Sequence, residues 1–99
     1  MPALNLSTRH RRQLRALAHH LKPVVLIGQA GVAEGVVQAI DRALLDHELI
    51  KVQMRQPEDK DALAQQLADA TDAALCGVVG HVAILYRPHP DAPRIQLDD

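Results

Sequence analysis

The fold is decided by the stretch Leu21-Lys22-Pro23-Val24-Val25-Leu26-Ile27-Gly28-Gln29-Ala30-Gly31. The four apolar residues at 24–27 fit a short strand covered on both faces, although four residues alone could also belong to a buried helix. Two glycines then bracket a short loop, and apolar residues recur at helical spacing from residue 32 to about residue 47. The stretch therefore predicts a strand that turns through a glycine loop into a helix.

A helix is expected before this stretch. Ser7 is a suitable N-cap, because its side chain can accept a hydrogen bond from the first turn, and Pro23 ends the helix. The apolar residues between them recur at the spacing that gathers one face of a helix, and they are Leu14, Leu17, Ala18 and Leu21. Arg11 and Arg15 lie one turn apart on the flank of this apolar stripe.

Three strands and one helix are expected after the stretch. Residues 49–55 alternate, with Ile50, Val52 and Met54 on one side, which is typical of a half-exposed strand. Pro57-Glu58-Asp59 suits the first turn of a helix. The buried stripe of that helix is expected to be Leu63, Leu67, Ala70 and Ala74. Residues 75–79 and 82–87 read as two strands with a tight connection at Gly80-His81.

The resulting order, a helix followed by βαβαββ, predicts an α/β fold. Its strand–helix–strand units imply right-handed crossovers and a mixed, four-stranded sheet in an α+β-like two-layer arrangement. The order of the strands within the sheet does not follow from the sequence. The 99 residues make one domain. Residues 88–99 hold three prolines and four charges, and we expect them to form a polar tail that adds little to the core.

The composition restricts the kind of protein. Tyr86 is the only aromatic residue, so the core must be aliphatic, and Cys76 is the only cysteine, so no intramolecular disulfide can form. No stretch approaches the roughly 20 apolar residues that a membrane-spanning helix needs. We therefore expect a cytoplasmic protein with no membrane association.

The charges are distributed unevenly along the chain. The net charge is −1, yet residues 1–31 contain no acidic residue and five cationic ones, namely Arg9, Arg11, Arg12, Arg15 and Lys22. Residues 56–99 contain three cationic and eight acidic residues. This asymmetry indicates a local anion-binding face better than the net charge excludes one. The alternative is a solvated, arginine-rich helix face without a function.

The glycine loop is the most informative candidate site. A loop with glycine at both ends, followed by a helix N-terminus with unpaired N–H groups, makes a phosphate-sized anion site. A GxxG loop clamps the nucleic-acid backbone in KH domains in the same way. The alternative is an ordinary strand-to-helix turn, and Gly77-Val78-Val79-Gly80 matches the same pattern at what we interpret as the end of a strand. The spacing of the glycines excludes both a Walker A loop and a dinucleotide fingerprint.

Catalysis is not indicated by any motif. His47-Glu48-Leu49-Ile50-Lys51 begins like a zinc-protease motif but has lysine where the second histidine ligand must stand. Cys76 lies in an apolar strand and is expected to be a core residue. His10, His19 and His20 could bind a metal, but a solvated helix end explains them better. We expect no catalytic residue, no metal, no cofactor and no small-molecule substrate.

The lack of aromatic residues also restricts the mode of RNA binding. One tyrosine cannot form the stacking platform of single-strand binders. Any contact must then come from Arg, Lys and backbone N–H groups to phosphate and sugar, which reads the shape of RNA better than its sequence. If about five cations contact phosphate, log K should fall against log salt with a slope of roughly −3 to −4.

Four separate blocks also carry a family resemblance, and they are Leu21-Lys22-Pro23-Val24-Val25, Ile27-Gly28 with Gly31-Val32, His47-Glu48-Leu49-Ile50-Lys51-Val52, and Val79-Gly80 with Leu85-Tyr86-Arg87-Pro88. Over residues 4–88 the chain resembles the CRM domain (chloroplast RNA splicing and ribosome maturation), most closely the stand-alone bacterial YhbY family. The resemblance implies a fold similar to the C-terminal domain of a bacterial translation initiation factor. It also implies RNA binding through the glycine loop and the neighbouring basic surface, and association with precursors of the large (50S) ribosomal subunit.

The candidate RNA-binding residues combine the loop with nearby cations, and they are Arg11, Arg12, Arg15, Lys22, Gly28, Gln29, Ala30, Gly31, Lys51 and Arg55. Three departures from the family pattern predict weaker, more salt-sensitive binding: Ala30 has no hydrogen-bonding side chain, His81 stands where relatives often have Lys or Arg, and the tail ends in Asp98-Asp99. The alternative function is a protein–protein adaptor on ribosomal particles. In that case Leu4, Leu6 and the apolar stripe of the first helix would contact a partner protein.

Overall fold

The computed structural model describes residues 6–28 and 32–97. Its elements follow the predicted order of one helix and then βαβαββ. They are α1 (Thr8–Ala18), β1 (Val25–Ile27), α2 (Glu34–His47), β2 (Leu49–Met54), α3 (Lys60–Ala70), β3 (Ala74–Val79) and β4 (Val82–Tyr86). No helix in this part of the chain is long and apolar enough to cross a membrane.

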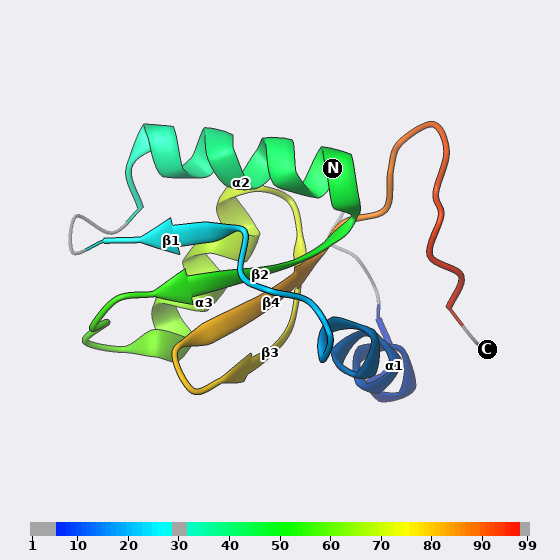
Figure 1. The fold of residues 1–99 in the computed structure, drawn as a ribbon, viewed down its shortest axis with the longest axis horizontal. Coiled ribbons are helices and arrows are strands. Elements are labelled where there is room, and N and C mark those ends of the chain that lie inside the picture. The colour runs from blue at the N-terminus through cyan, green and yellow to red at the C-terminus, as the bar shows by residue number, and fades with distance from the viewer. Residues whose placement is uncertain (1–5, 29–31, 98–99) are drawn as a thin grey trace.

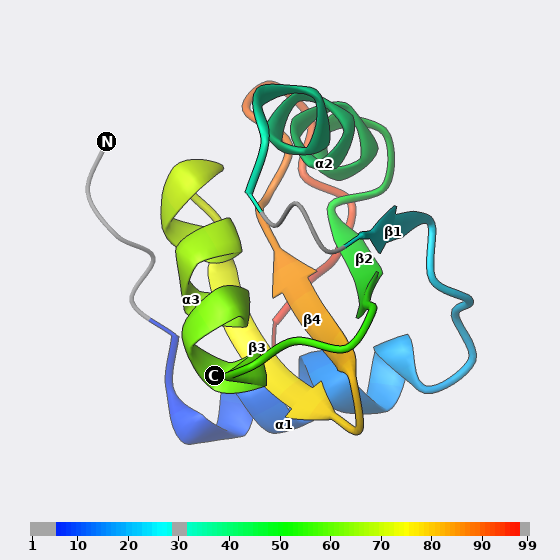
Figure 2. The same ribbon diagram turned by 90° about the vertical axis from the view of Figure 1, so that its left-hand side faces the viewer.

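The sheet has four strands in the order β1-β2-β4-β3 (Figure 1). β1 pairs with β2 in parallel, and β4 runs antiparallel to both β2 and β3. The predicted α/β class and mixed sheet are confirmed. The two-layer arrangement is wrong, because helices cover both faces: α2 and α3 lie on one face and α1 lies across the other (Figure 2).

The main core lies between the sheet and the pair α2 and α3. It consists of aliphatic side chains from five elements, which are Ile27, Ile40, Leu44, Ile50, Val52, Leu67, Ala68 and Leu85. The alternation predicted for β2 is confirmed, since Ile50, Val52 and Met54 are all buried on this side. Complete burial of a side chain such as Leu or Ile contributes roughly 1.5–3 kcal/mol, so this layer is a major source of stability.

The buried faces of α1 and α3 differ from the predicted stripes. In α1, Leu14 and Ala18 are buried, whereas Leu17 is 45% exposed; Leu21 lies beyond the end of the helix and is 39% exposed. In α3 the buried residues are Ala64, Leu67 and Ala68, while Ala70 is exposed and Ala74 belongs to β3. α3 also starts later than predicted. Its N-cap is Asp59, whose carboxylate accepts from the Ala62 N–H (3.1 Å), so Pro57 precedes the first turn.

The prediction that β1 is covered on both faces is wrong. β1 is an edge strand, and α1 packs mainly on the other three strands. Ile27 is buried against α2 and α3, but Leu26 points to the α1 side and is 61% exposed. The apolar run at residues 24–27 therefore forms an edge strand with one face open to solvent.

The segment after β4 is held to the domain by a buried carboxylate. Glu48, directly after α2, is completely buried. One of its oxygens accepts from the backbone N–H of Arg94 (2.8 Å) and Ile95 (3.1 Å), and the other accepts from that of His89 (2.9 Å). Ile95 and Leu97 pack against the core under α1. The segment thus adds more to the core than its polar composition suggested.

Candidate nucleic-acid interface

α1 begins with a capping box that fixes its position on the sheet. The Ser7 hydroxyl accepts from the His10 N–H (3.0 Å), and the His10 ring accepts from the Ser7 N–H (3.4 Å). Two N–H groups at the start of the helix are satisfied in this way, which favours the observed first turn. From this start, α1 places Arg11 and Arg15 over β3.

Both arginines bind backbone carbonyls of β3. Arg11 donates to the Leu75 carbonyl (3.3 Å) and to the Leu6 carbonyl (3.0 Å), and Arg15 donates to the Cys76 carbonyl (2.9 Å). The Leu75 and Cys76 carbonyls lie where the pairing of β3 with β4 shifts register, between Leu75 and Gly77. The two guanidinium groups therefore stabilise the packing of α1 on an irregular strand, and both side chains remain partly exposed.

The second GxxG match has a structural explanation. A Cβ at Gly77 would lie 2.8 Å from Cδ of Arg15, which is too close, so a side chain there would displace the arginine. Gly80 has a φ of +59° in the β3–β4 turn, a conformation that favours glycine. Both glycines are thus accounted for by the fold.

Arg15 and Lys51 come together with His19 in a small cavity of about 190 Å³, which we call the basic pocket. It lies between the end of α1 and the sheet, and its other lining residues are Pro23, Val79, Val82 and Ile84. The Lys51 ammonium donates weakly to the His19 carbonyl (3.5 Å), which suits the negative end of the helix dipole. Sequence reasoning did not place His19 here. The sequence signal that could have indicated this placement is the position of His19 at the C-terminus of an arginine-rich helix.

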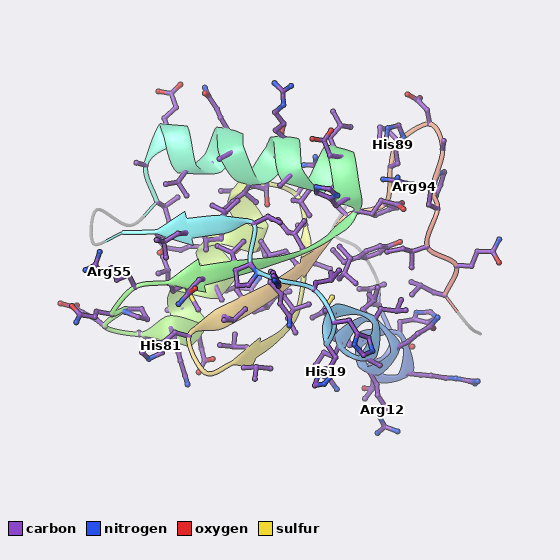
Figure 3. All side chains as sticks on the ribbon, in the orientation of Figure 1. Arg12, His19, Arg55, His81, His89 and Arg94 are labelled. Atoms are coloured by element: carbon purple, nitrogen blue, oxygen red, sulfur yellow. The ribbon has the colours of Figure 1, made fainter. Side chains whose placement is uncertain are left out.

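Gly28 and Arg55 lie at a different place, where the parallel strands β1 and β2 both end. The Arg55 N–H donates to the Ile27 carbonyl (3.0 Å), which keeps the two strand ends together. Figure 3 shows Arg55 and His81 at this end of the molecule, and Arg12 and His19 at the other. The predicted loop residues Gln29, Ala30 and Gly31 lie outside the described residues.

The N-cap residue of α2, just after the loop, provides no side-chain cap. Ala33 occupies the N-cap position and makes no side-chain hydrogen bond to the first turn. Its methyl group cannot satisfy the first N–H groups of the helix, so these need another acceptor. Glu34 in the first turn provides a negative charge near them.

Neither backbone conformation nor packing requires glycine at position 28. Gly28 does not have a φ in the left-handed range, and among the described residues a Cβ built on it would have no atom within 4 Å. It is also exposed. Gly28 therefore differs from Gly77 and Gly80, for which the fold supplies a reason.

The remaining two candidates stand apart from these clusters. Arg12 is exposed on α1 and points away from the sheet (Figure 3). Lys22 is exposed at the rim of an apolar groove of about 440 Å³ that also contains Leu17, Leu21 and Val24. The described candidates thus form the basic pocket, the strand-end site around Gly28 and Arg55, and two separate surface cations, while Arg11 is bound to carbonyls beside the pocket.

Cys76 does not have the environment of a nucleophile. It is buried, and burial raises the pKa of its thiol to about 11 in spite of the nearby Arg11 and Arg15 charges. A thiol with such a pKa is almost fully protonated at neutral pH. Over residues 6–28 and 32–97, no group of three or more His, Cys, Asp or Glu side chains could hold a metal ion.

Comparison with known proteins finds a matching domain family and relatives that align over most of the chain. The sequence profile of the CRS1/YhbY (CRM) domain matches residues 6–87. A protein of Haemophilus influenzae named as an RNA-binding protein is 44% identical over 94 residues, covering 93% of this chain and 94% of its own length. The YqeI protein of Bacillus subtilis, named as a probable RNA-binding protein, is 34% identical and covers 93% of this chain and 98% of its own.

A solved structure supports the same relationship. The solution structure of a hypothetical protein of Staphylococcus aureus, for which RNA binding has been suggested, has a TM-score of 0.83 with this chain. The two sequences are 35% identical, and the match covers 95% of this chain and all of the other. The shared fold therefore extends over nearly the whole molecule.

Proposed function

Because the chain belongs to the CRS1/YhbY (CRM) domain family, we propose that it is a non-catalytic protein that binds structured RNA by its sugar–phosphate backbone. The glycine loop, from Gly28 through Gln29 and Ala30 to Gly31, would make the first contact. The basic surface formed by α1 and β2 would make the second.

The observation that carries the proposal is the contrast between Gly28 and the other described glycines of the GxxG patterns. The fold needs glycine at 77 and at 80, but neither φ nor packing needs it at 28. Glycine also has a use when a second backbone must come close, because it has no Cβ. With α2 lacking a side-chain cap directly after the loop, an RNA phosphate is the acceptor that suits this end of the helix.

The basic pocket supplies a second point of contact. Arg15, Lys51 and His19 converge there, and two separated phosphate contacts would orient an RNA helix better than one. Arg12 and Lys22 lie outside the pocket and would add to the attraction at longer range. Arg11 has a mainly structural part, since it already donates to two carbonyls.

The RNA in question is proposed to be large-subunit ribosomal RNA or its precursor particle, in the cytoplasm. This part of the proposal follows from the family resemblance of the four sequence blocks. The relatives themselves are named only as RNA-binding proteins.

The test is a titration of a large-subunit ribosomal RNA fragment with variants that leave the fold intact. Lys22→Gln and Lys51→Gln remove charges from the proposed surface. Lys60→Gln, at the start of α3, is the matched control. We expect weaker binding from the first two variants and unchanged binding from the control. Equal affinity for all four proteins would refute the proposed surface. Arg11 and Arg15 are unsuitable for this test because their loss would also disturb β3.

A protein–protein adaptor on ribosomal particles is the second candidate. The apolar groove, with Leu17 and Val24 about half exposed at its rim, favours it. In that case, co-sedimentation with large-subunit precursors would resist high salt and would be lost in Leu17→Ser. The proposed RNA binding predicts release by salt and retention of binding in that variant.

A further inference from the structure

The structure contains a polar pocket beside Gly28 that the proposed backbone contacts do not use. We propose that this pocket holds one unpaired nucleobase of the bound RNA, preferably guanine, and that the Glu58 carboxylate recognises its amino edge. The inference rests on the proposed RNA binding and adds base recognition to it.

The pocket has a volume of about 550 Å³ and lies between the end of β1, the β2–α3 connection and the first turns of α3. This size falls within the range of small-molecule sites, roughly 300–1,000 Å³. Its lining residues are Gly28, Arg55, Gln56, Pro57, Glu58, Asp59, Ala62, Leu63 and Gln66. Gly28 stands at one side, so an RNA strand that passes the glycine loop could place a base in the pocket.

The backbone around the pocket is held in place. The Met54 N–H donates to the His81 carbonyl (2.7 Å), and the Arg55 N–H donates to the Ile27 carbonyl (3.0 Å). Gln56 takes a positive φ of 48° at the turn out of β2, and Asp59 caps α3. Such a turn can position side chains with little loss of entropy on binding.

Three polar side chains of the pocket are available for a ligand. Within residues 6–28 and 32–97, the side chains of Arg55, Glu58 and Gln66 form no hydrogen bond or ion pair. They provide a planar guanidinium, a carboxylate and an amide. The apolar groups of Pro57, Ala62 and Leu63 complete the lining.

The charge of the pocket does not suit phosphate. Glu58 and Asp59 bring two negative charges against one positive charge from Arg55, so a phosphate would be repelled. A neutral base with N–H donors fits better, because Glu and Asp accept hydrogen bonds from base amino groups. Unpaired bases also stack on arginine planes when no aromatic ring is present, and the chain's one aromatic residue, Tyr86, is buried elsewhere.

Guanine is the base whose edge fits a carboxylate best. Its ring N–H and its amino group lie side by side, so both can donate to the two oxygens of Glu58. Uracil presents a single N–H between two carbonyls, which the carboxylate would repel. The pocket should therefore discriminate between these two bases.

The experiment compares three hairpin RNAs whose uridine loops are uniform or carry one central guanosine or inosine. Inosine keeps the ring N–H and lacks the amino group. We expect the wild-type protein to bind the guanosine hairpin about tenfold more tightly than the uridine hairpin, with inosine between them. In Glu58→Gln this preference should largely disappear. Asp61→Asn is the matched control, because it removes an exposed charge from the same helix start without lining the pocket.

Equal binding of the three hairpins by the wild-type protein would overturn the base site and leave the backbone contacts intact. Retention of the full guanosine preference in Glu58→Gln would also overturn it. If none of the hairpins binds at all, both the base site and the proposed function fail.

Discussion

Replacement of Glu48 by glutamine should destabilise the domain more than any exposed substitution. The carboxylate accepts three backbone N–H bonds in a completely buried position. A glutamine oxygen could keep the bonds from Arg94 and Ile95, but the new amide NH₂ would face the His89 N–H, so one acceptor is replaced by a donor. Charge assistance to the remaining two bonds is lost as well.

The size of the effect follows from these contacts. A hydrogen bond to a charged group contributes about 1.5–3 kcal/mol, so losing one and weakening two should cost about 2–3 kcal/mol in the free energy of unfolding. For a domain of this size, that lowers the Tm by roughly 10–20 °C. Urea and thermal denaturation at neutral pH measure it. Glu58→Gln is the control, because this residue is exposed and should change stability by less than about 0.5 kcal/mol.

The same variant has a characteristic pH dependence. Burial alone would raise the pKa of the Glu48 carboxyl, but the N–H groups of His89, Arg94 and Ile95 and the charge of Arg94 outweigh it, so the pKa lies below its ordinary value. A carboxyl group whose pKa is lowered on folding stabilises the fold at pH values above its ordinary pKa. This contribution is lost as the pH falls through the folded-state pKa. The stabilities of wild type and Glu48→Gln should therefore converge in acid. A difference below about 0.5 kcal/mol at neutral pH, or one that grows in acid, would refute the assigned role.

Two other predictions separate structural from functional residues. Gly77→Ala should lower the free energy of unfolding by about 1 kcal/mol, since its Cβ would displace Arg15 and disturb the bond to the Cys76 carbonyl. Gly28→Ala should leave the Tm nearly unchanged. Equal losses of stability in the two variants would contradict the contrast between these glycines. For RNA binding, log K against log salt should have a slope of roughly −2 to −3, because Arg12, Lys22 and Lys51 are the cations of the proposed surface on α1 and β2 that lack strong internal bonds. A flat dependence would exclude phosphate contacts as the main source of affinity.

Local patterns in the sequence were sufficient for most of the elements. The alternation of Ile50, Val52 and Met54 predicted β2 and its buried side, and Ser7 marked the start of α1. These features depend on neighbours within a few residues, which a sequence displays directly. The same patterns could not show that Leu26 lies on an open edge, because the order of strands depends on contacts between distant segments.

The candidate site was predicted less completely for the same reason. Nothing near Arg11 or Arg15 in the sequence reveals that their guanidinium groups meet β3 carbonyls more than 60 residues away. In the sequence, Glu48 is noticeable only as part of the motif His47-Glu48-Leu49-Ile50-Lys51, whereas in the structure it binds backbone groups of the segment after β4. Long side chains that reach distant carbonyls or amides leave no periodic signal, so charge alone does not reveal that Arg11 and Arg15 also hold α1 on the sheet.

The most direct test of backbone binding at the glycine loop uses Gly28→Asp. The site has room for a side chain and an ordinary backbone conformation, so the Tm should stay close to that of the wild type. Affinity for a large-subunit ribosomal RNA fragment should fall about tenfold or more, because the new carboxylate would face the phosphate. A folded Gly28→Asp protein that binds this RNA as tightly as the wild type would contradict the proposal.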